Sequence, residues 1–212
     1  MTADQTTVHL LRHGEVHNPG GILYGRIPGY GLSELGAAMA QAAADVLAGR
    51  PVSYLGCSPL QRAQETAAPV AAALNVEIAT DERLIEPTNV FEGRQFGVGD
   101  GSLLQPSWWR HLYNPFRPSW GEPYAAIAER IAGAIADARQ RADGNEAVLV
   151  SHQLPIVTAR RAAEGRPLWH HPGRRLCGLA SLTSFRYRGD ELVAIRYIEP
   201  AGAASRLPER GA

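Results

Sequence analysis

The sequence predicts an α/β fold, in which a mostly parallel sheet carries helices on both faces as a three-layer arrangement. Short apolar runs typical of buried strands alternate along the chain with stretches of helical periodicity. Two of the apolar runs end directly at polar, chemistry-bearing residues, as strands of a parallel sheet often do at a ligand site. The 212 residues are 45% hydrophobic and 20% charged, which is the usual composition of a globular protein and enough for a core.

Strands and helices are expected at the following places along the chain. The expected strands are four apolar runs and a C-terminal hairpin around Gly189-Asp190: residues 7–11, 52–57, 76–79 and 147–150, then 179–188 with 191–198. The expected helices are residues 34–48 with Ser33 as N-cap, 59–74 with Ser58 as N-cap and Pro59 in the first position, 123–141 with isoleucines spaced by four, and 155–164.

The chain is expected to form a single domain over residues 1–212, because no linker or internal repeat divides it. Residues 81–124 lack a regular pattern and are rich in proline, glycine and tryptophan, so we expect a lid or a pocket wall, with a short helix at 103–113. Residues 200–212 are expected to be a frayed tail.

Composition excludes several classes of protein. All 21 basic residues are arginine, so the P-loop, Schiff-base and protein-kinase chemistries, which need lysine, are excluded. The formal net charge of zero argues against a nucleic-acid-binding protein. No apolar run is long enough to span a membrane and the N-terminus has no secretory pattern, so a cytoplasmic protein is expected. The two cysteines match neither a zinc site nor a disulfide framework.

Histidine and arginine residues stand at the predicted carboxyl ends of the strands. Arg12-His13 follows the first strand and Ser151-His152 follows the fourth, while Arg62 lies one helical turn after the second strand. One such histidine is as easily explained by hydrogen bonds to loop carbonyls. Two of them with arginines at one sheet edge predict a site for an oxyanion, and phosphate matches the forked donors of arginine. No metal site is expected, because arginines repel a cation and a third ligand is missing.

Five segments, in order, resemble the signatures of the histidine phosphatase superfamily, the phosphoglycerate-mutase-like proteins. They cover residues 7–160 and read Leu11-Arg12-His13-Gly14-Glu15, Leu32-Ser33-Glu34-Leu35-Gly36, Ser58-Pro59-Leu60-Gln61-Arg62-Ala63-Gln64-Glu65-Thr66-Ala67, Leu84-Ile85-Glu86 with Phe91-Glu92-Gly93, and Val150-Ser151-His152. Each motif alone is weak, but five in the family's order are specific. The resemblance implies a phosphoglycerate-mutase-like fold.

The resemblance also implies a role for individual residues. His13 is expected to be the nucleophile that forms a phosphohistidine, and Arg12, Arg62 and His152 are expected to bind the transferring phosphoryl group. Glu86 is expected to be the general acid and then the base, with Glu92 and Glu82 as alternatives. The residues assigned to substrate binding are Asn18, Gly25 and Gln153. Gln153 stands where the family usually has glycine, so it adds a side chain at the rim of the pocket.

The function predicted from these features is hydrolysis of a small phosphorylated metabolite without cofactor or metal. Two alternatives stay open: a mutase-type phosphotransferase, and a phosphate-binding regulatory protein without turnover. Mutases of this family tend to be longer, which favours the phosphatase. The sequence specifies neither the phosphomonoester nor the oligomeric state, and a homodimer is compatible with it.

Overall fold

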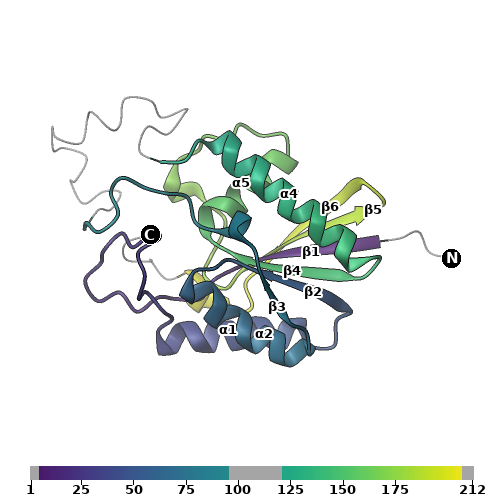
Figure 1. The fold of residues 1–212 in the computed structure, drawn as a ribbon, viewed down its shortest axis with the longest axis horizontal. Coiled ribbons are helices and arrows are strands. Elements are labelled where there is room, and N and C mark those ends of the chain that lie inside the picture. Colours follow the sequence, from purple (N-terminus) through teal and green to yellow (C-terminus); the bar gives the residue numbers. More distant parts are fainter. Residues whose placement is uncertain (1–4, 96–120, 207–212) are drawn as a thin grey trace.

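The computed structural model describes residues 5–95 and 121–206 of the chain (Figure 1). The strands are β1 (Gln5–Arg12), β2 (Val52–Cys57), β3 (Ile78–Thr80), β4 (Glu146–Ser151), β5 (Leu182–Arg188) and β6 (Glu191–Ile198). The helices are α1 (Glu34–Leu47), α2 (Gln61–Leu74), α4 (Tyr124–Ala142) and α5 (Gln153–Ala163), with short 3₁₀ helices η1 (Glu82–Leu84), η3 (Pro172–Arg174) and η4 (Gly202–Arg206). The elements predicted within these residues are present, with ends that differ by a few residues at most.

The six strands form one sheet in the order β3-β2-β4-β1-β5-β6. The first four in this order are parallel, whereas β5 runs antiparallel to β1 and pairs with β6 as the predicted hairpin. Arg12 is the register partner of Ser151, and Cys57 is the partner of Val150. The carboxyl ends of β1, β2 and β4 therefore meet at one edge of the sheet, as the sequence predicted.

Helices cover both faces of the sheet, which confirms the predicted three layers (Figure 1). Helices α1 and α2 pack on one face around Leu11 and Val148, and α4 and α5 pack on the other face around Leu10 and Leu149. Successive residues of a strand point to opposite faces, so each buried strand contributes to both cores. This explains why the strands are continuous apolar runs.

The start of α2 differs from the prediction. The helix begins at Gln61 with Leu60 at the cap position, and no side chain caps it. Ser58 is therefore not the N-cap residue. Its hydroxyl accepts from the backbone N–H of Leu60 at 3.4 Å, ahead of the helix, and the end of β4 brings a histidine to the same hydroxyl.

A short 3₁₀ helix, η4, forms within the segment for which the sequence predicts a frayed tail. Ala201 and Ala204 pack against a small apolar cluster formed by Met39, Leu179 and Ala180, and η4 forms there. The pattern of small residues gave no signal of this contact, because it depends on α1 and the segment before β5. The remainder of the tail and the predicted helix at 103–113 lie outside the described residues.

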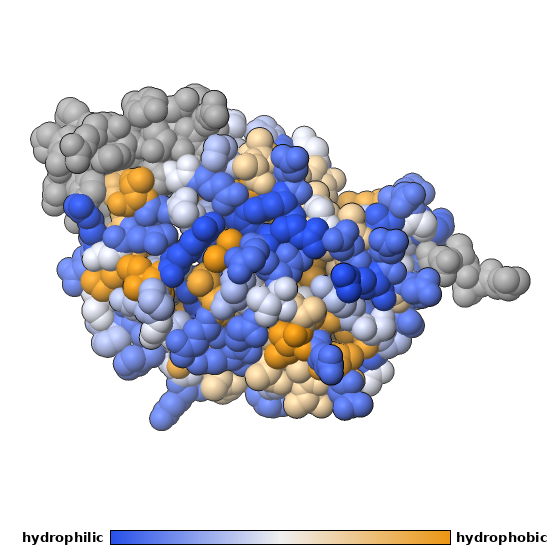
Figure 2. Space-filling view, in the orientation of Figure 1, coloured by the Kyte–Doolittle hydropathy of each residue, from blue (hydrophilic) through white to orange (hydrophobic). Residues whose placement is uncertain are grey.

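Hydrophilic residues form a band across the face of the molecule shown in Figure 2, and apolar residues appear on that face as separate patches. Within residues 5–95 and 121–206, no helix is both long enough and apolar enough to cross a membrane.

Candidate active site

The ends of β1 and β4 bring His13 and His152 together. Their ring centroids are 5.1 Å apart, at an interplanar angle of 57°. Both side chains are buried, as are Arg12 from the end of β1 and Arg62 from the first turn of α2. The structure thus gathers four of the predicted residues at the sheet edge where ligands of α/β proteins bind.

His13 is held in one tautomer. Its Nδ1 lies 2.8 Å from the carbonyl oxygen of Gly14, and this acceptor places the ring proton on Nδ1. Burial, with the positive charges of Arg62 and Arg12, holds the pKa of His13 well below its usual value. The ring is therefore neutral near pH 7, and Nε2 keeps the lone pair that a nucleophile needs.

His152 is oriented by Ser58. Its Nε2 lies 2.8 Å from the Ser58 hydroxyl oxygen, and both side chains are buried. When the hydroxyl donates to Nε2, the ring proton lies on Nδ1, which is buried and makes no hydrogen bond within the described residues. Burial lowers the pKa of His152, and Arg62 and His13 lower it further. A neutral His152 can therefore donate its Nδ1 proton to a ligand.

Both arginines are anchored by neutral groups. Arg12 donates from Nη1 to the carbonyl of Cys177 at 2.8 Å, and Arg62 donates from Nη2 to the carbonyl of Gly25 at 2.8 Å. The guanidinium of Arg62 also lies 4.7 Å from the ring centroid of Tyr24. The Nε of Arg62 is buried and has no hydrogen-bond partner in the described part of the chain. These carbonyl groups fix the orientation of both guanidinium groups, whose forked donors suit an anion.

Glu86 lies next to His152. One of its carboxylate oxygens, Oε2, is 3.8 Å from Nδ1 of His152, and its side chain is 20% exposed. Two hydrogen bonds fix the backbone at this point: Ser151 donates to the carbonyl of Leu84 at 2.7 Å, and Arg26 donates to the carbonyl of Glu86 at 2.6 Å. Burial raises the pKa of Glu86, against the opposing effect of the nearby arginines. A carboxyl group with a raised pKa can act as a proton donor.

The two alternative carboxylates have different surroundings. Glu92 accepts a hydrogen bond from the backbone N–H of Asn89 at 3.2 Å and so closes its own turn. Glu82 is exposed in η1. Of these three candidates, Glu86 is the one with an ion-pair distance to His152.

Two glycines allow α1 to approach the loop that carries His13. A Cβ atom built on Gly36 would collide with the carbonyl oxygen of Glu15, and one built on Gly14 would collide with the carbonyl oxygen of Gly36. Thr66 of α2 closes the loop from the other side, because its hydroxyl accepts from the N–H of Gly14 and donates to the carbonyl of Arg62. The glycine of the predicted Leu32–Gly36 motif is therefore required by a backbone contact.

The substitution Gly36→Ala is expected to lower the free energy of unfolding by about 1–3 kcal/mol, because the new methyl group meets a backbone oxygen that cannot rotate away. The matched control is Gly133→Ala in α4, where a Cβ would meet only the end of Arg83, at 3.6 Å. There the higher helix propensity of alanine is expected to add up to about 1 kcal/mol. Urea denaturation of both variants measures the difference, and equal stabilities would contradict the proposed collision.

Comparison with known proteins decides the family. The sequence model of the Histidine phosphatase superfamily (branch 1) matches residues 8–199. The chain belongs to this family. It is 56% identical over 198 residues to an uncharacterised protein of Mycobacterium tuberculosis, which covers 93% of this chain and 98% of that protein.

Named relatives of this histidine phosphatase family member include phosphatases and a probable phosphoglycerate mutase of Salmonella choleraesuis, which is 28% identical over 94% of each chain. Phosphoserine phosphatase 1 of Hydrogenobacter thermophilus is 29% identical, over 69% of this chain and 71% of that protein. The solved structure of a mycobacterial glucosyl-3-phosphoglycerate phosphatase is 25% identical, with a TM-score of 0.68, and the match covers 92% of this chain and 96% of that chain. The α/β fold and the family predicted from the sequence are thus confirmed.

The three residues assigned to substrate binding have different surroundings. Asn18 holds a loop: its side chain donates to the carbonyl of Ile22 and accepts from the N–H of Ile22. Gly25 has a positive φ of 40° and presents its carbonyl to Arg62. Gln153 is the first residue of α5, and its side-chain oxygen lies 2.9 Å from Nη1 of Arg175.

The sequence interpretation missed Arg175 altogether and missed the contact between Ser58 and His152. Arg175 follows η3 in a loop that holds two consecutive arginines, and sequence alone does not tell which of the two points inward. Gln153 could have indicated the position of Arg175. It departs from the family pattern, and a partly buried polar side chain needs a hydrogen-bond partner.

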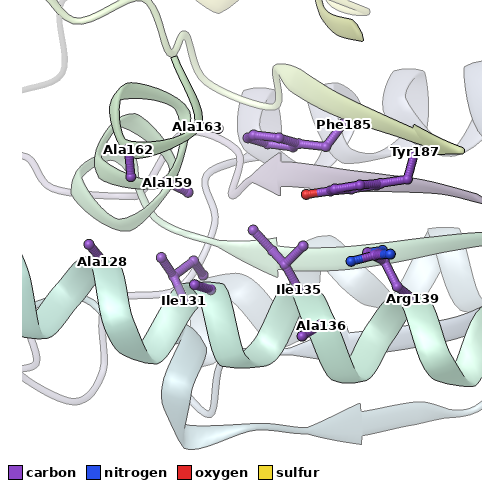
Figure 3. A pocket seen from close by; sticks show the side chains of 11 residues that line it. Ala128, Ile131, Ile135, Ala136, Arg139, Ala159, Ala162, Ala163, Phe185 and Tyr187 are labelled. Atoms are coloured by element: carbon purple, nitrogen blue, oxygen red, sulfur yellow. The ribbon is translucent and has the colours of Figure 1, made fainter. Parts of the chain in front are cut away.

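A cavity of about 300 Å³ lies away from this candidate site, between α4, α5 and β5 (Figure 3). Phe185 and Tyr187 of β5 face Ile135 and Arg139 of α4 across it (Figure 3). In the sheet register Tyr187 pairs with Thr6, near the opposite end of β1 from His13. The cavity therefore plays no part in the chemistry described above.

Proposed function

We propose that this protein hydrolyses small phosphomonoesters through a phosphohistidine intermediate on His13. The proposal rests on two buried N–H donors beside Nε2 of His13 that have no hydrogen-bond partner among the described residues. Nε of Arg62 and Nδ1 of His152 are buried and make no hydrogen bond with the described residues. Buried donors need acceptors, and a phosphoryl group supplies three oxygens in one small volume.

In the first step, the lone pair on Nε2 of His13 attacks phosphorus and the bond from phosphorus to the ester oxygen breaks. Arg12, Arg62 and His152 stabilise the charge on the three equatorial oxygens. The carbonyl of Gly14 accepts from Nδ1 throughout, so the positive charge that develops on the imidazole ring has a fixed partner. The carboxyl group of Glu86 gives its proton to the leaving oxygen.

In the second step, Glu86 acts as a base and takes a proton from water as the water oxygen attacks phosphorus. The nitrogen–phosphorus bond breaks, its electron pair returns to Nε2, and inorganic phosphate leaves. The raised pKa of Glu86 serves both steps, because the same group must give a proton and then accept one.

The names of the relatives include both phosphatases and a probable phosphoglycerate mutase, so the choice between hydrolysis and transfer within one substrate needs an experiment. The direct experiment measures release of inorganic phosphate from p-nitrophenyl phosphate and from a panel of aliphatic phosphomonoesters. Release with multiple turnovers is the expected result. Movement of phosphate within a substrate without release would make the protein a mutase, and phosphate binding without turnover would make it a regulatory protein.

Hydrolysis is expected to continue at an unchanged rate in the presence of a chelator. The proposed electrophilic groups are two arginines and a histidine, whose positive charge and N–H donors replace a metal ion at the phosphoryl oxygens. Rates are measured before and after exhaustive dialysis against EDTA, with and without added Mg²⁺. Activity that is lost on dialysis and restored by Mg²⁺ would contradict this prediction.

A further inference from the structure

Arg175 carries a positive charge that the proposed hydrolysis of a simple phosphomonoester does not use. Its guanidinium donates from Nη1 to the side-chain oxygen of Gln153 at 2.9 Å and from Nε to Nε2 of His170 at 3.0 Å. Its Nη2 makes no hydrogen bond within the described part of the chain. One amino group of a rigidly held guanidinium thus remains available to a ligand.

Neutral groups hold this arginine. The ring of His170 has Nδ1 2.7 Å from the carbonyl of Leu168, which places the proton on Nδ1 and leaves Nε2 as the acceptor for Arg175. The ring of Tyr124 packs on His170, with centroids 5.7 Å apart. Among the described residues, no carboxylate forms an ion pair with Arg175. A partly buried cation with neutral anchors is costly unless an anion binds it.

Arg175 also lies at the edge of the phosphate site. Gln153 follows His152 directly, and Cys177, whose carbonyl holds Arg12, is two residues after Arg175. Burial lowers the pKa of Arg175, and among the nearby charged groups Glu86 raises it and Arg12 lowers it further. The guanidinium is thus hydrogen-bonded to the side chain of the residue that directly follows His152.

We propose that Arg175 and Gln153 form a subsite for a second anionic group of the substrate, a carboxylate or a second phosphate ester close to the phosphoryl group that is transferred. The proposal rests on the proposed function and specifies its substrate class. The planar guanidinium offers a charge-assisted hydrogen bond from Nη2, and the amide nitrogen of Gln153 can add a neutral one. His170 keeps the fork of Arg175 in one orientation.

Two other roles for Arg175 predict different results. If Arg175 bound the transferred phosphoryl group, its loss would slow the hydrolysis of every phosphomonoester to the same degree. If it acted only by its charge on Glu86, its loss would shift the pH profile of every alkyl ester. A subsite for a second anion affects only those substrates that carry one.

The experiment uses pairs of probes that differ in one charged group. The pairs are 3-phosphoglycerate with glycerol 3-phosphate, phosphoserine with phosphoethanolamine, and glucose 1,6-bisphosphate with glucose 6-phosphate. Each compound is measured as a competitive inhibitor of p-nitrophenyl phosphate hydrolysis and, where it is turned over, by kcat/KM. The first two pairs test a carboxylate and the third tests a second phosphate.

The wild-type protein is expected to prefer the doubly anionic member of at least one pair. Arg175→Gln is expected to reduce kcat/KM or raise the inhibition constant for that member by roughly 10- to 100-fold, which is the range for a lost charge-assisted hydrogen bond. The singly anionic member and p-nitrophenyl phosphate are expected to change less than about twofold.

The Gln153→Glu variant tests the role of the Arg175 charge, because it changes the shape of the side chain at position 153 hardly at all. A carboxylate at the position of the amide would pair with Arg175, and we expect the same selective loss. The matched control is Arg174→Ala, because Arg174 is the exposed neighbouring arginine and its removal takes one positive charge from the same loop. This control is expected to keep the wild-type preference.

Three results would overturn the subsite: no preference within any pair in the wild-type protein, an equal loss for all compounds in Arg175→Gln, or a uniform shift of the pH profiles. A wild-type protein that fails to hydrolyse p-nitrophenyl phosphate would instead refute the proposed function. The two failures are therefore distinguishable.

Discussion

His13→Ala is expected to abolish turnover and the phosphoenzyme together, whereas His152→Ala is expected to retain a trace of activity. His13 would supply the bond to phosphorus, so without Nε2 no covalent intermediate forms and the rate falls by more than about 10³-fold. His152 would supply one of several donors to the phosphoryl oxygens, and loss of one such donor costs about 10²- to 10³-fold. The difference between the two variants separates a nucleophile from an electrostatic stabiliser.

The measurement combines steady-state phosphate release with trapping of phosphate on the protein that is stable to base and labile to acid. His17→Ala is the matched control, because this exposed histidine lies in the same loop region. Circular dichroism establishes that the variants are folded. Trapped label that persists in His13→Ala would show that the nucleophile is another residue.

Glu86→Gln is expected to slow hydrolysis of an alkyl phosphomonoester by about 10²- to 10⁴-fold and to slow formation of the phosphoenzyme from p-nitrophenyl phosphate far less. An alkoxide leaves poorly and needs a proton, whereas nitrophenolate leaves without one. Attack of water on phosphohistidine would also lose its base. The phosphoenzyme is therefore expected to accumulate with the aryl ester.

Glu92→Gln is the matched control for this assignment, because its carboxylate closes a turn at the same pocket. The pH profile adds a second readout. A general acid must be protonated, and burial raises the pKa of Glu86, so alkyl-ester hydrolysis falls as the pH rises through that raised pKa. This fall is expected to disappear in Glu86→Gln. If Glu92→Gln shows the dependence on the leaving group and Glu86→Gln does not, the two roles must be exchanged.

The sequence by itself predicted the fold class, the order of the elements and the family. These features depend on local patterns: apolar runs such as residues 52–57 can be buried on both faces only as central strands, and the spacing of Ile127, Ile131 and Ile135 places one helix face in the core. The parallel order of these strands then brings Arg12-His13 and Ser151-His152 to one edge. The gathering of the candidate residues was therefore predictable from the sequence.

Only the tertiary structure decided which atoms meet at that edge. Ser58 could have capped α2, but the end of β4 places His152 at its hydroxyl. Arg174 and Arg175 are equivalent in sequence, yet one is exposed and the other contacts Gln153 and His170 from a loop more than twenty residues away along the chain from Gln153. Such contacts join segments that are distant in the sequence, and their geometry depends on the packing of whole elements rather than on local propensity. For that reason the gathering of the candidate residues at one sheet edge could be predicted from the sequence, whereas the candidate determinant of the substrate required the fold.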